Sequence, residues 1–186
     1  MTRIAIVTGS TRPNRQSRTV AEWALSVAAE RTDAEYELVD IAEHDLPLFD
    51  EPVPPSFGQY AGEHTRAWAQ VVASFDGYLF VTPEYNHAAP PALTNAIDFV
   101  YPEWNNKAAG FVGYGSLGGA RAVENLRLIA AEIQVATVRT AVALTLADDF
   151  KDYVEFAPRP HHADVLNTTL DQLITWARAL EGVRAS

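Results

Sequence analysis

The stretch RIAIVTGSTRPNRQSRTVAEWAL (residues 3–25) decides the fold class, because it joins an apolar strand to a helix through a polar loop. Residues 3–9 form a run of branched apolar side chains typical of a buried strand, whereas apolar residues recur at helical spacing over 17–32. The loop between them precedes a helix N-terminus, where backbone N–H groups and the helix dipole favour an anion. The stretch therefore predicts a strand–loop–helix unit with an anion-binding loop.

The alternation of strand and helix continues to the end of the chain. The further strands are predicted over 35–41, 77–82, 108–115 and 138–146, and the further helices over 63–76, 90–101, 118–133 and 163–182. Continuous apolar strands are typical of a parallel sheet covered on both faces. We therefore predict an α/β fold, a three-layer doubly wound domain with a five-stranded parallel sheet and helices on both faces. Ligands of such folds bind at the carboxyl ends of the strands. The segments 45–62 and 147–161 are predicted to be loops.

Composition limits the classes of function. The 186 residues fit one domain, 1–186, which is long enough to bury a sizeable core. The absence of cysteine excludes disulfides, thiolate metal sites and cysteine nucleophiles, and fits the cytoplasm. The apolar run in MTRIAIVTG is too short for a signal peptide, and no stretch approaches the roughly 20 residues that cross a bilayer. The net charge of −10 argues against nucleic acid. We expect a cytoplasmic protein with neither a nucleic-acid nor a membrane partner.

The first loop, GSTRPNRQS (9–17), has the chemistry of a phosphate site. The guanidinium groups of Arg12 and Arg15 offer planar donors that match phosphate oxygens. A Walker loop would require GxxxxGK[ST], and a dinucleotide loop would require glycine where Thr11 stands. The loop thus suits a phosphate monoester better than a pyrophosphate. The alternative is that the arginines form surface ion pairs with nearby acids such as Glu22.

Two further loops follow the third and fourth predicted strands. In TPEYNHAAPPALTNAIDF (82–99), Tyr85 and the exposed backbone could flank a flat heterocycle, although a rigid turn is the alternative. GYGSLGGAR (113–121) spells GxGxxG, but a dinucleotide site would need an acidic residue at the end of the next strand. The nearest candidate, Glu132, lies at the end of the intervening helix. We interpret these glycines as allowing close backbone approach to a flat group.

The remaining candidate side chains favour no catalytic or metal site. The histidines show no metal-ligand spacing, and His161–His162 is predicted to be a solvated pair. No GxSxG or Ser–His–Asp pattern is readable, so no catalytic residue is assigned. Trp68, Trp104 and Trp176 are predicted to lie in the core or at an interface.

Together the three loops resemble the NADPH-dependent FMN reductase family of flavodoxin-like proteins, over residues 3–145. The resemblance implies a strand order of 2-1-3-4-5 and bound FMN. It implies that the first loop cradles the FMN phosphate, that the second lies along the isoalloxazine ring, and that the third packs at the ring's other edge. The FMN-binding residues that it implies are Ser10, Arg12, Asn14, Arg15, Gln16, Ser17, Pro83, Glu84, Tyr85, Asn86, Tyr114, Gly115, Ser116, Gly118 and Gly119.

Two positions depart from the family pattern. Many relatives have a lysine where this chain has Thr94, and relatives often have glycine where it has Ser17. Neither change removes the phosphate cradle, although both leave open what the partner subunit and the nicotinamide cofactor contact. The resemblance also implies a homodimer or homotetramer, and the apolar 90–104 segment supports association.

The function implied is an FMN-dependent NAD(P)H oxidoreductase. It would take electrons from NADPH or NADH and pass them to a quinone, free flavin, azo compound or similar acceptor in two alternating half-reactions, with no side-chain nucleophile. The alternative is an FMN-binding electron carrier that a partner protein reduces; Arg12 and Arg15 count against it, because classical carriers of this fold use a hydroxyl-rich loop without arginines. A short-chain dehydrogenase, suggested by IVTGSTR, fails because no YxxxK occurs.

Overall fold

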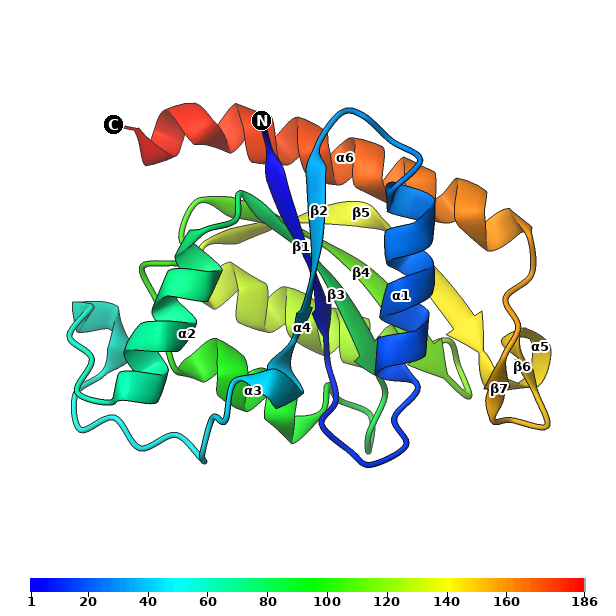
Figure 1. Cartoon of the computed structure of the whole chain (residues 1–186), viewed down its shortest axis with the longest axis horizontal. Coiled ribbons are helices and arrows are strands. Elements are labelled where there is room, and N and C mark those ends of the chain that lie inside the picture. Colours follow the sequence, from blue (N-terminus) through cyan, green and yellow to red (C-terminus); the bar gives the residue numbers. More distant parts are fainter. Residues whose placement is uncertain (186) are drawn as a thin grey trace.

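The computed structural model describes residues 1–185 as a three-layer α/β domain, which confirms the predicted fold class and strand order (Figure 1). The parallel sheet has the order β2-β1-β3-β4-β5. Its strands are β1 (Arg3–Thr8), β2 (Glu35–Asp40), β3 (Gly77–Pro83), β4 (Lys107–Gly115) and β5 (Val135–Thr145). The helices that cover it are α1 (Ser17–Ala28), α2 (Glu63–Ala73), α3 (Pro91–Asp98), α4 (Ala120–Glu132) and α6 (His161–Arg184).

The two predicted loops contain short elements that periodicity could not reveal. The short 3₁₀ helix η1 (Ile41–Glu43) follows β2, and a second, η2 (Pro55–Phe57), lies within the proline-rich 45–62 segment. The 147–161 segment holds most of α5 (Leu146–Asp149) and a hairpin made of β6 (Phe150–Lys151) and β7 (Glu155–Phe156). Elements of two to four residues span about one helical turn at most, so no repeating pattern of apolar residues can mark them.

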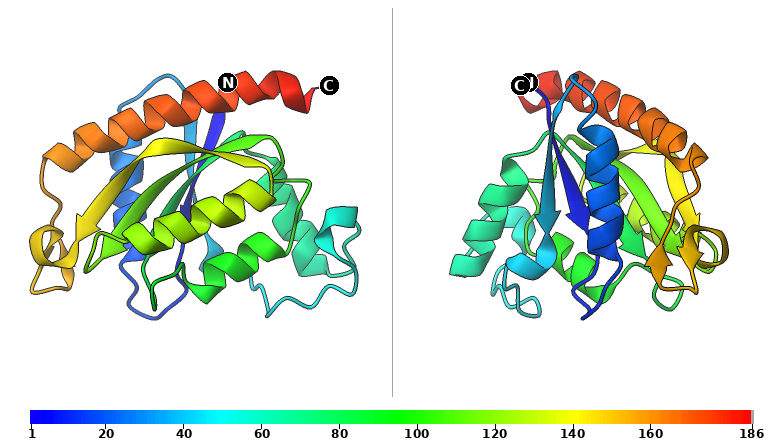
Figure 2. Two further views of the ribbon diagram at one scale, coloured as in Figure 1. Left: turned by 180° about the vertical axis from the view of Figure 1, so that it is seen from behind. Right: turned by 45° about the vertical axis from the view of Figure 1, so that its right-hand side comes forward.

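Alternate residues of each strand supply two separate cores. Helices α1 and α6 cover one face of the sheet, over residues such as Ile4, Ile6 and Leu79, whereas α2, α3 and α4 cover the other, over Val7 and Phe80 (Figure 2). This arrangement explains why the strands read as continuous apolar runs, because side chains are buried on both faces. Because the five strands are parallel, their carboxyl ends lie at the same edge of the sheet.

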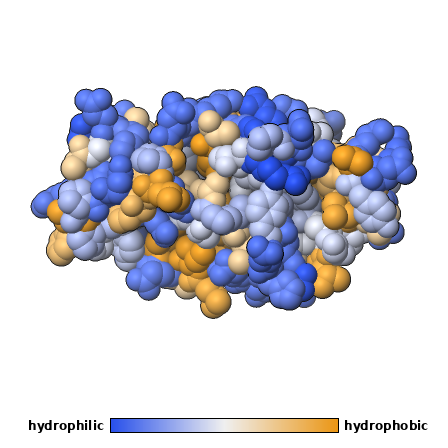
Figure 3. Space-filling view, turned by 90° about the horizontal axis from the view of Figure 1, so that it is seen from below, coloured by the Kyte–Doolittle hydropathy of each residue, from blue (hydrophilic) through white to orange (hydrophobic). Residues whose placement is uncertain are grey.

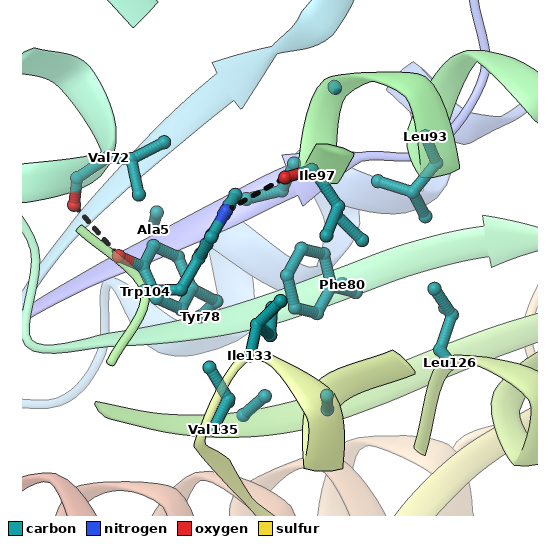
Figure 4. Packing of buried hydrophobic residues seen from close by; sticks show 14 of the residues in the cluster. Ala5, Val72, Tyr78, Phe80, Leu93, Ile97, Trp104, Leu126, Ile133 and Val135 are labelled. Carbon is teal, nitrogen blue, oxygen red and sulfur yellow. Dashed lines mark hydrogen bonds between the residues drawn. The ribbon is translucent and has the colours of Figure 1, made fainter. Parts of the chain in front are cut away.

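Of the three tryptophans predicted to lie in the core or at an interface, two are buried. Trp68, on α2, and Trp104, which follows α3, lie in the core on the same face of the sheet. The indole of Trp104 donates to Ile97 O at 3.1 Å, and the hydroxyl of Tyr78 donates to Val72 O at 2.8 Å, so that these rings are buried without losing their hydrogen bonds (Figure 4). Trp176, by contrast, is half exposed on α6.

The apolar residues of 90–104 pack inside their own chain. Leu93, Ile97, Phe99, Val100 and Trp104 are all buried in the core that α2, α3 and α4 cover. A buried side chain offers no surface to a second copy. The prediction that these side chains support association of two chains is therefore wrong. They are apolar because they pack in the core of their own chain.

The prediction of a solvated His161–His162 pair is wrong for His162, which is buried beside Asp149. Its Nε2 lies 2.9 Å from Asp149 Oδ1. The Asp149 carboxylate also accepts from Thr145 N at 2.8 Å, from Arg159 N at 3.2 Å and from Arg159 Nε at 3.1 Å. It thereby ties both ends of the 146–160 segment, with its hairpin, to the start of α6. The sequence did not predict this contact, because Asp149 and His162 are 13 positions apart and the segment between them folds into the β6–β7 hairpin.

His162 should make stability depend on pH near neutrality. Burial holds the pKa of His162 below its usual value, although Asp149 opposes the shift. The unfolded chain therefore takes up a proton near pH 6.5 that the folded chain refuses until a lower pH. We expect the free energy of unfolding to fall between pH 7.5 and 5.5, and to fall less steeply in His162→Gln. Urea titrations at four pH values would measure it, and equal slopes would contradict it.

Candidate functional site

The loops after β1, β3 and β4 meet at the carboxyl edge of the sheet, where Figure 3 shows apolar patches among polar side chains. The hydroxyls of Ser10 and Tyr85 share a hydrogen bond of 2.9 Å, which joins the first loop to the second. The N–H of Glu84 donates to Tyr114 O at 3.2 Å, which joins the second loop to the third. The three loops singled out from sequence thus form one continuous surface.

The first loop is fixed at both ends and exposed in the middle. Gly9 N donates to Val81 O at 2.7 Å, and a Cβ at Gly9 would lie 2.7 Å from the same oxygen, so only glycine fits there. The hydroxyl of Ser17 donates to Ser10 O at 3.4 Å. Between these anchors Arg12 and Asn14 are exposed, and Gln16 is partly exposed. Asn14 adopts the left-handed region, with φ 57°, which asparagine tolerates.

The N-terminus of α1 is open to an anion. No side chain in the described part of the chain caps it at Gln16, and its first turn contains no acidic residue. The first helical bond runs from Val20 N to Gln16 O at 2.9 Å, so the N–H groups of Ser17, Arg18 and Thr19 have no acceptor within the helix. Together with the helix dipole, these donors favour a bound negative group.

Asp40 determines which arginines near the first loop remain free to contact an external anion. Its buried carboxylate pairs with Arg15 at 2.5 Å and with Arg18 at 3.0 Å, and accepts from Thr8 Oγ1 at 2.7 Å. Burial alone would raise the pKa of Asp40, but these hydrogen bonds outweigh it and hold that pKa below its usual value. Arg15 Nε remains buried without an acceptor among the described residues.

Arg15 and Arg18 thus form ion pairs, Arg15 with the buried Asp40 and Arg18 with surface acids as well. Arg18 also contacts Glu22 and Glu43, at 3.1 Å and 2.7 Å. Arg12 forms no ion pair with any residue in 1–185, and its guanidinium is exposed. Arg12 is thus the arginine of this loop that is free to meet an external anion.

The second loop is a rigid two-residue turn. Tyr85 and Ala88 exchange backbone hydrogen bonds of 3.0 Å, and both Asn86 (φ 51°) and His87 (φ 68°) between them have positive φ angles. Positive φ at both central residues is the signature of a type I′ hairpin turn. The tight turn exposes Asn86 at its tip and leaves Tyr85 partly exposed, while Pro83 is buried in β3.

The third loop uses its glycines to fold back on its own strand. Gly118 and Gly119 have φ angles of 63° and 70°. A Cβ at Gly119 would lie 2.6 Å from Tyr114 N, and one at Gly113 would lie 2.7 Å from Gly118 O. The turn exposes Ser116, and Gly115 begins it by accepting from Gly118 N. These contacts account for the GxGxxG spelling without a dinucleotide.

Tyr114 lies differently from the rest of the third loop. Its ring is buried beside Phe150, with 6.0 Å between the ring centroids, and burial raises the pKa of its hydroxyl. Its backbone, by contrast, belongs to the surface where the loops meet.

Gly119→Ala should destabilise the protein by about 1–3 kcal/mol. Alanine would have to adopt the left-handed backbone conformation of Gly119, and its methyl group would clash with backbone atoms of Gly113 and Tyr114. Gly182→Ala is the matched control, since Gly182 lies in α6 with nothing within 4 Å of an added Cβ. That change should be neutral or stabilising by up to about 1 kcal/mol. Thermal and urea unfolding would measure both; equal stability of the two variants would contradict this account of the loop.

Glu84 caps α4 from the second loop. Its carboxylate accepts from Arg121 N at 3.1 Å and from Arg121 Nε at 2.5 Å, and Arg121 in turn contacts His87 at 2.7 Å. Burial would raise the pKa of Glu84, but the hydrogen bonds from Arg121 hold it below its usual value. The N-terminus of α4 therefore already holds a carboxylate, whereas that of α1 has neither a side-chain cap nor an acidic residue in its first turn. The sequence analysis assigned no role to Arg121, although it belongs to the third loop, because its partner Glu84 is 37 residues away.

Neither a cluster of metal ligands nor a membrane-spanning helix is found among the described residues. Within 1–185, no three histidine, aspartate or glutamate side chains are grouped as a metal site would require. No helix in the same range is long and apolar enough to cross a membrane.

Comparisons with known proteins agree with this geometry. The model of the family described as NADPH-dependent FMN reductase matches residues 2–149. The chain is 38% identical over 149 residues to an NAD(P)H-dependent FMN reductase of Schizosaccharomyces pombe, covering 79% of this chain and 74% of that protein. It is 33% identical over 140 residues to the 2-hydroxy-1,4-benzoquinone reductase of a Burkholderia species, covering 72% of each.

A solved structure shows the same fold. The flavoenzyme FerB, an NAD(P)H:(acceptor) oxidoreductase from Paracoccus denitrificans, superposes with a TM-score of 0.75 at 22% identity, over 96% of this chain and 98% of that one. Because it covers 96% of this chain, the superposition extends beyond residue 149, where the match to the family model ends.

Proposed function

Since the chain belongs to the NADPH-dependent FMN reductase family, we propose that it passes electrons from NAD(P)H to a quinone, free flavin, azo compound or similar small acceptor in two alternating half-reactions. The protein is an oxidoreductase that uses NAD(P)H and FMN. Similarity to quinone reductases of Burkholderia and Pseudomonas putida supports a small quinone-like acceptor. Bound FMN supplies the hydride and electron chemistry, which no amino-acid side chain provides.

The open N-terminus of α1 carries this proposal. The free N–H groups of its first turn, the unpaired guanidinium of Arg12 and the orphaned Nε of Arg15 fit a phosphate monoester. The same loop contains Ser10, Asn14, Gln16 and Ser17. Ser10 and Ser17 are buried, and the Ser17 hydroxyl already donates to Ser10 O. We assign the FMN phosphate to this loop.

The second and third loops would hold the flat ring. The hydroxyl of Tyr85 shares a hydrogen bond with Ser10, and the turn at Asn86 is closed by two backbone hydrogen bonds between Tyr85 and Ala88. The pair formed by Glu84 and Arg121 braces this turn against the glycine loop. In this proposal Glu84 acts by positioning the turn, and the backbones of Gly115 to Gly119 border the ring.

The absorbance spectrum of the purified protein tests the cofactor directly. Flavin bands, with FMN released on denaturation, are expected. Steady-state assays of the flavin-loaded protein should then show NADPH oxidation with quinones, free flavin or azo dyes. Absence of turnover with all of these acceptors would refute the oxidoreductase proposal.

A stopped-flow experiment separates the enzyme from an electron carrier. Rapid bleaching of the flavin by NADPH alone is expected of the enzyme. A carrier would require a partner protein for reduction, so slow bleaching by NADPH alone would favour that alternative.

We also propose a cytoplasmic homodimer or homotetramer. The absence of cysteine and the family membership support this, and the exposed apolar side chains of Leu48, Phe49 and Phe57 offer a surface outside the core. Light scattering at micromolar concentration should give at least twice the chain mass, and a monomer would contradict it.

A further inference from the structure

The 146–160 segment carries the middle of a row of four aromatic rings. Phe150 of β6 and Phe156 of β7 lie against each other, with 5.2 Å between their ring centroids. Phe156 contacts Trp23 of α1 at 5.7 Å, and Phe150 contacts Tyr114 of β4 at 6.0 Å. These tilted and edge-on arrangements are favourable for aromatic pairs. This aromatic row thus joins α1 to the carboxyl end of β4.

The segment that carries the two phenylalanines is fixed at both ends. The carboxylate of Asp149 accepts from Thr145 N before the hairpin and from Arg159 N after it. The backbone of the same residue accepts from Ala157 N at 2.8 Å. The hairpin therefore has a set position at the carboxyl edge of the sheet, beyond the end of β5 (Figure 1). Its two rings are held in place and do not belong to a free loop.

The β4 end of the aromatic row lies beside the first loop. The side chain of Tyr114 is buried in the core that α1 and α6 cover, together with Val20 of α1. Burial raises the pKa of Tyr114, whereas hydrogen bonding with Ser17 and the charge of Arg12 oppose that rise. The Tyr114 hydroxyl is therefore close enough to interact with Ser17, the first residue of α1.

We propose that Tyr114, held by the 146–160 segment through the aromatic row, positions the first turn of α1 and thereby sets the affinity for the phosphate end of FMN. Tyr114 is a positioning residue in this inference, because it acts through Ser17 and α1. The inference rests on the proposed function, which places the FMN phosphate at this helix. The match to the family model ends at residue 149, before both phenylalanines, so that match does not account for the row.

The phosphate should depend on this row more than the flavin ring does. The phosphate would be held by N–H groups of the first turn of α1, and hydrogen bonds weaken steeply as their geometry departs from linearity. The ring would lie between the second and third loops, which the pair formed by Glu84 and Arg121 braces independently of α1. Riboflavin has the same ring as FMN but lacks the phosphate. The ratio of the riboflavin Kd to the FMN Kd therefore measures the effect on the phosphate end alone.

Phe156→Ala interrupts the row in its middle. FMN and riboflavin are titrated separately into the full chain after removal of flavin, and fluorescence quenching gives each Kd. The Kd ratio should fall about fivefold or more, because α1 loses the contact that fixes it to the hairpin. Tyr153→Ala is the matched control, since Tyr153 is 70% exposed in the turn of the same hairpin. Its ratio should stay within about twofold of the parent protein. Equal ratios in the two variants would overturn the inference.

Tyr114→Phe tests the inference without disturbing the packing, even if Phe156→Ala does not fold. The variant keeps the ring and its contact with Phe150 but loses the hydroxyl beside Ser17. The Kd ratio should fall about fivefold, as expected for the loss of one hydrogen bond. An unchanged ratio in Tyr114→Phe would overturn the positioning role, whatever its effect on stability.

Tyr78→Phe is the control for the loss of a buried hydroxyl. The hydroxyl of Tyr78 donates to Val72 O at 2.8 Å, at the opposite, amino end of the sheet. This variant should lose stability but keep its Kd ratio within about twofold of the parent protein. A fall as large as in Tyr114→Phe would mean that the ratio follows stability, and would overturn the inference.

Failure of this inference is distinguishable from failure of the proposed function. A protein that oxidises NADPH with bound FMN, but whose Kd ratio is the same in all four variants, overturns only the positioning role. A protein whose ratio falls in Phe156→Ala and Tyr114→Phe alone, but which oxidises no NADPH, overturns only the proposed activity. A parent protein that binds riboflavin as tightly as FMN overturns the positioning role together with the phosphate assignment.

Discussion

Asp149→Ala should lower the free energy of unfolding by about 3–5 kcal/mol. Asp149 is fully buried and accepts hydrogen bonds from two backbone N–H groups and from Arg159, with His162 at 2.9 Å. Its removal leaves the backbone N–H groups of Thr145 and Arg159 and the buried ring of His162 without this acceptor, and each buried donor left unsatisfied costs about 1–3 kcal/mol. Urea unfolding at pH 7 would measure the loss.

The control for this variant lies on α6, the helix whose His162 contacts Asp149. Asp164→Ala changes an exposed carboxylate in the first turn of α6, where the helix dipole makes it worth at most about 1 kcal/mol. The pKa of Asp149 lies below its usual value because the N–H donors and Arg159 outweigh the opposing effect of burial. Its contribution is therefore present above about pH 4 and is lost as pH falls through the lowered value. Equal losses in both variants would contradict the account of the buried carboxylate.

Arg12→Ala should weaken FMN binding by about 2 kcal/mol, roughly thirtyfold in Kd, because it removes a charge-assisted contact to the phosphate. Arg12 is the arginine of the loop that no carboxylate within residues 1–185 holds. Flavin fluorescence quenching during titration of the flavin-free protein would measure Kd.

Arg18→Ala is the comparison variant. Its guanidinium is engaged by Glu22, Asp40 and Glu43, so FMN affinity should stay within about threefold of the parent protein. If Arg12→Ala leaves FMN affinity unchanged, the phosphate does not lie against this guanidinium and the interpretation of the loop is wrong.

The sequence predicted the fold well because the relevant information is local. The spacing of apolar residues identified all five strands of the main sheet and the five longer helices. The patterns over 3–9 and 17–32 are the first strand and the first helix of this series. The same reasoning missed the β6–β7 hairpin, whose strands have two residues each. It also misread the apolar 90–104 segment as a surface for a partner, since periodicity does not tell which neighbour covers an apolar side chain.

The candidate site could be predicted only in part from the residues that neighbour one another in the sequence. Residue types in the three loops indicated a phosphate and a flat ring, and the structure brings the three loops together. The sequence did not reveal that Glu84 caps α4 or that Asn95 ties the proline-rich 45–62 segment to α3, because each contact joins segments more than 35 residues apart.

The sequence by itself determined the layers of the fold, the order of its elements along the chain and the chemistry of its loops, because each depends on residues a few positions apart. Only the tertiary structure decided which charges remain available. Asp40, 25 residues from Arg15, engages that arginine, and Glu84, 37 residues from Arg121, fills the N-terminus of α4. Ion pairing depends on distance in space, and the sheet sets that distance by placing β2 beside β1 and β3 beside β4. What remains open is the N-terminus of α1 together with Arg12.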